Sequence, residues 1–119
     1  GMALWDYFES LKQRGHRLLT HTEGMAASMA GILLQAGDVR SMGRESYLLI
    51  HEVQASMMGS YGELADRMEW LKVVQGRILD IFAKRSNLSK ATLKKRWTRT
   101  DWWIDSDEAL KLGLVDEVR

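Results

Sequence analysis

The sequence predicts a mixed α/β protein in which short strands alternate with helices around a mainly parallel sheet. Apolar and β-branched runs of strand length occur at 17–22, 39–42 and 47–50. A helix is expected at 28–36, before Gly37, and a much longer amphipathic stretch covers 62–85. Alternation of strands with helices favours parallel pairing, because the helix returns the chain to the starting edge of the sheet.

Length and composition limit the classes of protein to consider. The chain has 119 residues, which fits one domain over 1–119, and a formal net charge of +1. That charge gives no long-range attraction to nucleic acid or to an anionic membrane. Cysteine is absent, and no apolar run approaches the roughly 20 residues that span a bilayer. We expect a cytoplasmic protein that needs no cofactor or metal and binds neither nucleic acid nor a membrane.

The segment around Ser28 has the pattern of a nucleophile at a helix start. A strand at 17–22 leads through Gly24 into a helix that begins at Ser28, among Gly, Ala and Met neighbours. Small neighbours admit a substrate carbonyl, and the first backbone N–H groups of a helix, here that of Met29, point where an oxyanion forms. The alternative is that the small residues only allow close helix packing.

Two further polar residues stand at the ends of predicted strands. His51 ends the apolar run 47–50, and Asp101 opens the aromatic run 101–104. Active sites of open α/β sheets lie at strand ends, so Ser28, His51 and Asp101 form a candidate nucleophile, base and orienting acid. The alternative for His51 alone is a hydrogen-bonded structural histidine.

Four segments resemble the ClpP family, the proteolytic subunits of Clp proteases. They are Gly24–Ala30, Ser46–His51, Thr100–Ile104 and Asp107–Val118. The resemblance implies a crotonase-like fold of repeated strand-strand-helix units. It also implies a serine endopeptidase that hydrolyses unfolded polypeptides, with Ser28 as nucleophile, His51 as base, Asp101 as its partner and Met29 N–H as an oxyanion donor. An ATP-dependent unfoldase is the implied partner.

The same resemblance leads us to expect a chain that corresponds to the C-terminal part of such a subunit. In the family, strands and a Gly-Gly pair that helps to form the oxyanion hole precede the point where this sequence begins. Loss of one oxyanion donor costs about 10²–10³ in turnover. We therefore expect weak or absent activity from this chain.

The stretch at 62–85 is expected to be a protruding helix. Its apolar residues recur at spacings of three and four, and at about 1.5 Å per residue it would be roughly 35 Å long. A core this small cannot cover it, so we expect a partner surface. The resemblance identifies 52–86 as the handle that joins subunits into homo-oligomers. Gly76, inside the helix, is expected to mark the close approach of another backbone.

Three other helices are expected. The first, 3–14, should pack over the sheet and end at Gly15. Ser89 should cap the second, 90–97, whose basic side chains suit a solvated face better than a nucleic-acid site. Asp105 should cap the last one.

Two alternative functions remain open at this point. The first is a non-catalytic ClpP-like interaction module that assembles through the handle. The second is a crotonase-type acyl-CoA enzyme, in which paired backbone N–H groups polarise a thioester. The three matching triad segments disfavour the second alternative.

Overall fold

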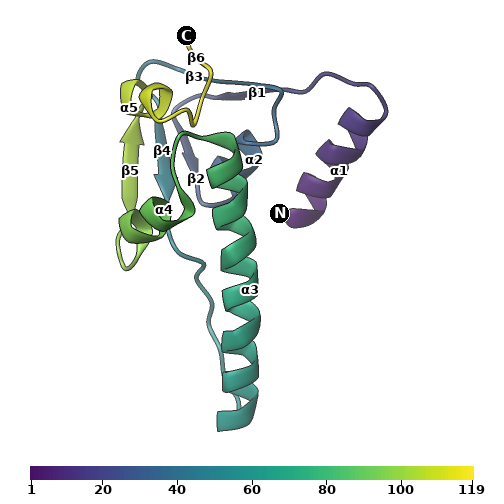
Figure 1. Cartoon of the computed structure of the whole chain (residues 1–119), viewed down its shortest axis with the longest axis vertical. Coiled ribbons are helices and arrows are strands. Elements are labelled where there is room, and N and C mark those ends of the chain that lie inside the picture. Colours follow the sequence, from purple (N-terminus) through teal and green to yellow (C-terminus); the bar gives the residue numbers. More distant parts are fainter.

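The computed structural model describes all residues 1–119. The chain is built around two consecutive strand-strand-helix units (Figure 1). In each unit the first strand joins one sheet and the second strand joins the other. The units are β1 (Leu19–Thr22), β2 (Met25–Ala27) and α2 (Met29–Leu34), then β3 (Val39–Met42), β4 (Tyr47–Ile50) and α3 (Tyr61–Arg85). The expected mixed α/β class and its repeating unit are confirmed.

The remaining elements flank these two units. They are α1 (Met2–Gln13), α4 (Lys90–Trp97), β5 (Trp102–Asp105), α5 (Ser106–Lys111) and β6 (Glu117–Val118). The caps explain several of the helix starts. The side chain of Ser89 accepts a hydrogen bond from Thr92 N, and Asp105 accepts one from Glu108 N, as expected from the sequence. No helix is both long and apolar enough to cross a lipid bilayer.

The strands form two three-stranded sheets. One has the order β1-β3-β6 and is parallel throughout. In the other, of order β2-β4-β5, β2 runs parallel to β4, whereas β5 pairs antiparallel with β4. In β4 and β5 every second residue faces the core, so Leu48, Ile50, Trp102 and Ile104 are buried. This alternation fixes the register, because a slip of one residue would expose all four side chains.

The region before Ser28 differs from the expectation in one respect. The sequence predicted a glycine turn followed directly by a helix, but the strand β2 lies between Gly24 and Ser28. Gly24 adopts φ +72° in the turn. A strand of three residues is too short to give a periodic pattern, which is why the sequence concealed it.

Helix α1 forms where expected, but its predicted packing over the sheet is wrong. It contains no buried residue and lies to one side of the body, near the upper part of α3 (Figure 1). Trp5 is its contact with the core, to which that side chain is packed while partly buried. The side chain of Lys12 also donates to the carbonyl of Ala36, after α2, at 3.2 Å.

Helix α3 projects from the body, so the molecule extends 49 Å along its longest axis (Figure 1). Only Ile78, Leu79 and Phe82 of this helix are buried. Its first half has the irregular segment 51–60 beside it, fixed by hydrogen bonds such as Arg67 Nη1 to Met58 O at 3.2 Å. Within this chain no backbone approaches Gly76, because a Cβ placed there would meet nothing within 4 Å.

Arg40 is a buried cation on β3 that joins four parts of the chain. Its guanidinium makes two hydrogen bonds to the Asp116 carboxylate, at 2.7 and 3.1 Å. It also donates to Gln35 Oε1 after α2, at 2.6 Å, and to the carbonyl of Arg85 at the end of α3. The hydrogen bonds from Arg40 to the Asp116 carboxylate lower the pKa of Asp116 from its ordinary value of 3.8. Arg40 thereby connects β3 with the end of α2, the end of α3 and the loop before β6.

We predict that Asp116→Asn lowers the free energy of unfolding by about 1–3 kcal/mol at pH 7, measured by urea denaturation. A fully buried pair would cost about 3–5 kcal/mol, and the estimate is reduced because the Asp116 side chain is 39% exposed. The folded-state pKa lies below the unfolded one, so this stabilisation is present above the unfolded pKa and is lost as pH falls through the folded pKa. The difference between variant and wild type should therefore shrink in acid.

Asp107→Asn is the matched control for this measurement. Asp107 lies 3.6 Å from Arg44, and both side chains are largely exposed. Exposed pairs contribute little, so the control should change stability by less than about 0.5 kcal/mol. Equal effects of the two substitutions would contradict a special role for the Arg40 network.

Candidate active site

Ser28 stands at the sharp junction between β2 and α2 with a strained backbone. Its φ is +54° and its ψ is −121°, a combination that side-chain-bearing residues rarely adopt. Its N–H donates to Leu49 O at 3.0 Å, which anchors the junction to the neighbouring strand β4. A serine on a sharp strand-to-helix turn can present its hydroxyl outward, which is the geometry of a nucleophile elbow.

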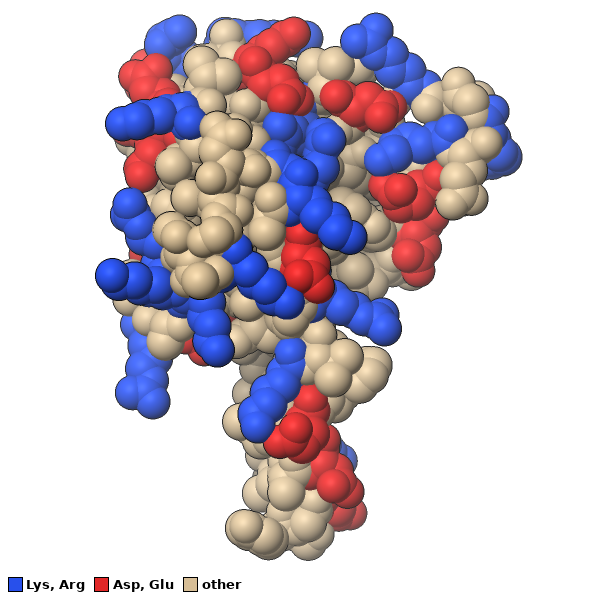
Figure 2. All heavy atoms as spheres, viewed as in Figure 1, with Lys and Arg blue, Asp and Glu red and all other residues tan.

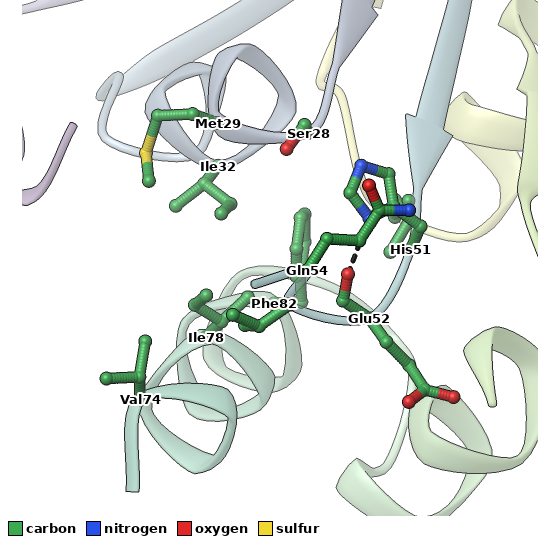
Figure 3. A pocket seen from close by; sticks show the side chains of 11 residues that line it. Ser28, Met29, Ile32, His51, Glu52, Gln54, Val74, Ile78 and Phe82 are labelled. Atoms are coloured by element: carbon green, nitrogen blue, oxygen red, sulfur yellow. Dashed lines mark hydrogen bonds between the residues drawn. The ribbon is translucent and has the colours of Figure 1, made fainter. Parts of the chain in front are cut away.

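His51 follows the last residue of β4 and lines the same cavity as Ser28. The cavity has a volume of about 280 Å³. Figure 3 shows Ser28 and Met29 at the start of α2, His51 at the end of β4, and the apolar side chains of α3 on the opposite side. The apolar lining residues are Met29, Ile32, Ile50, Val53, Val74, Ile78 and Phe82. The expected juxtaposition of elements therefore brings a hydroxyl and an imidazole to one apolar hollow.

The candidate triad is not hydrogen-bonded in this structure. The Ser28 hydroxyl makes no hydrogen bond to the His51 ring, and the Asp101 carboxylate makes none at all. His51 Nδ1 is instead 2.6 Å from the carbonyl oxygen of Glu52 (Figure 3). Asp101 lines a second cavity of about 420 Å³, whose other lining residues include His51, Glu52, Trp97, Arg99 and Thr100. Asp101 is exposed there, at the rim of the site.

Glu52 is a residue whose part in the site the sequence did not predict. Its carbonyl accepts from His51, and its carboxylate accepts a hydrogen bond from the backbone N–H of Arg99. Arg99 has the left-handed φ of +54°. The only sequence signal was an acidic residue directly after the histidine, which is a common arrangement in any loop.

Trp97 lines the second cavity, and its buried side chain carries an unsatisfied donor. The side chain is 1% exposed, and its indole Nε1 has no hydrogen-bond partner. A buried donor without an acceptor costs about 1–3 kcal/mol. Among buried side-chain polar atoms this is the one orphan, and its residue lies beside Asp101 and Glu52 in the cavity lining.

A further hollow, of about 340 Å³, lies beside His21 and Glu23 and is lined by residues of α1, β1, β2 and α2. His21 Nδ1 is 2.8 Å from Ser41 Oγ, and His21 Nε2 is 3.7 Å from the Glu23 carboxylate. Ser41 is buried in β3, so its hydroxyl is inaccessible to a substrate. No group of three or more His, Cys, Asp and Glu side chains is arranged to hold a metal ion.

Comparison with known proteins gives consistent matches over the whole chain. The profile of the family described as Clp protease matches residues 1–119. The chain is 31% identical to the ATP-dependent Clp protease proteolytic subunit of Deinococcus radiodurans, over 99% of the chain and 57% of that protein. It is 29% identical to proteolytic subunit 1 of Streptomyces coelicolor, over 99% and 53%, and 27% identical to proteolytic subunit 2 of Tropheryma whipplei, over 100% and 65%.

We predict that Ser28→Gly makes the protein about 1 kcal/mol more stable than Ser28→Ala. Glycine tolerates the positive φ, which costs other residues about 1–3 kcal/mol, although its greater freedom in the unfolded chain offsets part of the gain. Thermal or urea unfolding of the two variants measures the difference.

Ala27→Gly serves as the control, since Ala27 is the neighbouring strand residue and has no positive φ. That substitution should cost about 0.5–1 kcal/mol. Suppose that Ser28→Gly is less stable than Ser28→Ala by as much as Ala27→Gly is less stable than the wild type. The junction at Ser28 is then not strained in solution.

Proposed function

The chain belongs to the Clp protease family, and on that basis we propose that it acts as a serine peptidase on unfolded polypeptides, with Ser28 as nucleophile. The observation that carries this proposal is the strained Ser28 junction, which opens on the same cavity as His51. The chain spans between 53% and 65% of the length of the relatives compared above. Peptidase activity of this chain is therefore inferred from its site and from the family together.

The proposed reaction follows the general serine-peptidase scheme. Ser28 Oγ attacks the peptide carbonyl while His51 accepts its proton, and His51 then donates that proton to the departing amine. Water hydrolyses the resulting acyl-enzyme with the same base. The Met29 N–H, which donates to no acceptor in the chain, is the proposed oxyanion donor. Asp101 is the third member that the family resemblance implies.

The cavity lining favours an apolar substrate side chain next to the cleaved bond. Ile32, Val74, Ile78 and Phe82 form its far walls, and they would desolvate an aliphatic or aromatic group at about 25 cal/mol per Å². A charged side chain has no counter-charge deep in this hollow. Short peptides with Leu, Met or Phe before the cleaved bond are the substrates to test first.

A second candidate function is a non-catalytic interaction module. The observation that favours it is the absence of a hydrogen bond between Ser28 and His51, together with the uncovered apolar residues of α3. Unliganded sites often have loose catalytic geometry that tightens on binding substrate, and chemical labelling of Ser28 distinguishes the two functions.

We predict that a fluorophosphonate probe labels Ser28 and that Ser28→Ala abolishes the labelling. A hydroxyl activated by a neighbouring base reacts with such probes, whereas ordinary serines do not. Intact-mass spectrometry and peptide mapping measure the extent and the position of labelling.

Ser46→Ala is the matched control, because Ser46 is buried and lies outside the cavity. It should be labelled like the wild-type protein. Complete absence of labelling in a folded wild-type protein would favour the interaction module, and labelling at another serine would reject Ser28 as nucleophile.

We further propose that α3, the core of the expected handle 52–86, joins two copies of the chain in an antiparallel pair. The half of α3 far from the body carries Glu63, Asp66 and Glu69, and Figure 2 shows acidic side chains gathered there. Basic side chains gather over α4 (Figure 2). A groove between α3 and α4 is lined by Lys72, Lys90 and Lys94.

The position of Gly76 supports a particular register for this pair. Asp66, Glu69, Val73 and Gly76 lie on one side of α3 at spacings of three and four. Open space surrounds Gly76 within the groove, so a second helix can approach it closely. An antiparallel partner centred near Trp70, which is 62% exposed, sets Asp66 of one copy opposite the groove of the other. On the basis of family membership, an ATP-dependent unfoldase is the proposed further partner. The cytoplasmic location stays a prediction.

We predict that Asp66→Lys and Lys94→Glu each weaken self-association by about tenfold or more, and that a mixture of the two variants restores it. Neither side chain has an ion pair within the chain, and circular dichroism checks that α4 still forms in Lys94→Glu, since Lys94 lies in its last turn. Each variant alone brings like charges together, whereas the mixed pair has opposite charges at both contacts. Analytical ultracentrifugation measures the association.

Lys111→Glu, an exposed reversal on α5, is the control and should associate like the wild type. Weakened association that the mixture does not restore would contradict the proposed register.

A further inference from the structure

A hollow of about 530 Å³ lies between α1 and the base of α3, the end of that helix nearest the body (Figure 1). It is larger than either cavity at the candidate active site and shares no lining residue with them. Its volume is in the range of pockets that hold small ligands, about 300–1,000 Å³. One face of each helix supplies most of the lining, and it includes Trp5 and Asp6 of α1 with Arg77, Ile81 and Lys84 of α3.

Both helices that form this hollow are fixed to the rest of the chain. On α1, the partly buried Trp5 packs against the core, and Lys12 Nζ donates to the carbonyl of Ala36 at 3.2 Å. These two contacts are about 10 Å apart along the helix, at 1.5 Å per residue. On α3, the Arg85 guanidinium donates to two backbone carbonyls after α2, at 3.1 and 2.5 Å. The two walls therefore share an attachment at the end of α2.

Unpaired charges of opposite sign line the hollow from its two sides. The chain itself neutralises two of the charged side chains in the lining, through the pairs Lys12–Glu9 at 2.7 Å and Asp80–Lys90 at 2.9 Å. Asp6 on α1, and Arg77 and Lys84 on α3, have no ion pair within the chain. A ligand that carries both an ammonium and a carboxylate group therefore meets an opposite charge on each helix.

The lining also has an apolar part between these charges. Trp5 and Ile81 come from opposite helices, and both are partly buried against the core. An apolar side chain in the middle of a ligand would lose its contact with water there. A free amino acid has both charges on one carbon atom and cannot reach two helices across a hollow of this size. A dipeptide extends about 7 Å and separates the two charges.

We propose that this hollow binds a short peptide with free termini and apolar side chains. The ammonium group of the peptide lies toward Asp6, and its carboxylate lies toward Arg77 and Lys84. The statement that such a peptide is a product of this chain's own reaction rests on the proposed function. The binding itself does not, because Ser28 and His51 line other cavities.

Titration of the full chain with the dipeptide Leu-Phe tests the proposal. The readout is the ¹⁵N–¹H signal of the Trp5 indole, which Trp5→Phe identifies by its loss. We expect Leu-Phe to shift this signal until it saturates. Phenylalanine, and the uncharged N-acetyl-Leu-Phe-amide, should bind about tenfold more weakly, since each lost ion pair changes the affinity about three- to fivefold.

Substitutions on the two helices assign the two ends of the peptide. Asp6→Asn should weaken Leu-Phe binding about three- to fivefold and leave N-acetyl-Leu-Phe, which has no ammonium group, unaffected. Arg77→Gln should weaken Leu-Phe to a similar extent and leave Leu-Phe-amide, which has no carboxylate, unaffected. Asp107→Asn and Arg17→Gln are the matched controls, because both residues are exposed and lie outside the hollow. They should bind Leu-Phe like the wild type.

The proposal is wrong if Leu-Phe leaves the Trp5 signal unmoved, or if phenylalanine or the uncharged peptide binds as tightly as Leu-Phe. It is also wrong if the control substitutions weaken binding as much as Asp6→Asn and Arg77→Gln do. Circular dichroism checks the fold of each variant, and where a variant does not fold, the comparison of ligands on the wild type decides. Failure of fluorophosphonate labelling at Ser28 would reject the peptidase function and leave this titration valid.

Discussion

The buried guanidinium of Arg40 is the constraint on which the rest of the structure depends. A cation that is 5% exposed must have its donors satisfied, and Arg40 obtains acceptors from the end of α2, the end of α3 and the loop before β6. Arg85 adds to the same junction by donating to Gln35 O and Gly37 O. The long helix is therefore anchored at its base, although most of its length has no core beside it.

This anchoring positions the cavity at the candidate site. The base of α3 presents Ile78 and Phe82 toward Ser28 and His51, which come from the ends of two paired strands (Figure 3). The strained serine is held on one side by its bond to Leu49 O, and on the other side by α2. The rigid parts of the fold thus supply the apolar walls, while the polar groups that hold His51 come from the irregular segment after β4.

The handle has a chemical asymmetry that the body does not share. Its free half is acidic and its base, together with α4, is basic (Figure 2). The Asp80–Lys90 pair at 2.9 Å ties α4 to α3, and the hydrogen bond from Lys90 lowers the pKa of Asp80. The two ends of α3 therefore carry opposite charge. A parallel pairing of two copies would place like charges together at both ends. An antiparallel pairing places opposite charges together.

The sequence by itself determined the local elements and placed Ser28 and His51 at the ends of two of them. The strands 39–42 and 47–50 follow from apolar runs, and helix 90–97 follows from its Ser89 cap. The small residues around Ser28 predicted a turn that presents a hydroxyl. These features depend on neighbours in the chain. Tertiary structure alone decided the burial of Arg40, the lateral position of α1, the open space at Gly76 and the bond of His51 to Glu52 instead of Asp101. Each of these features depends on which residues from distant segments come together in the folded chain. The local sequence pattern does not predict such contacts.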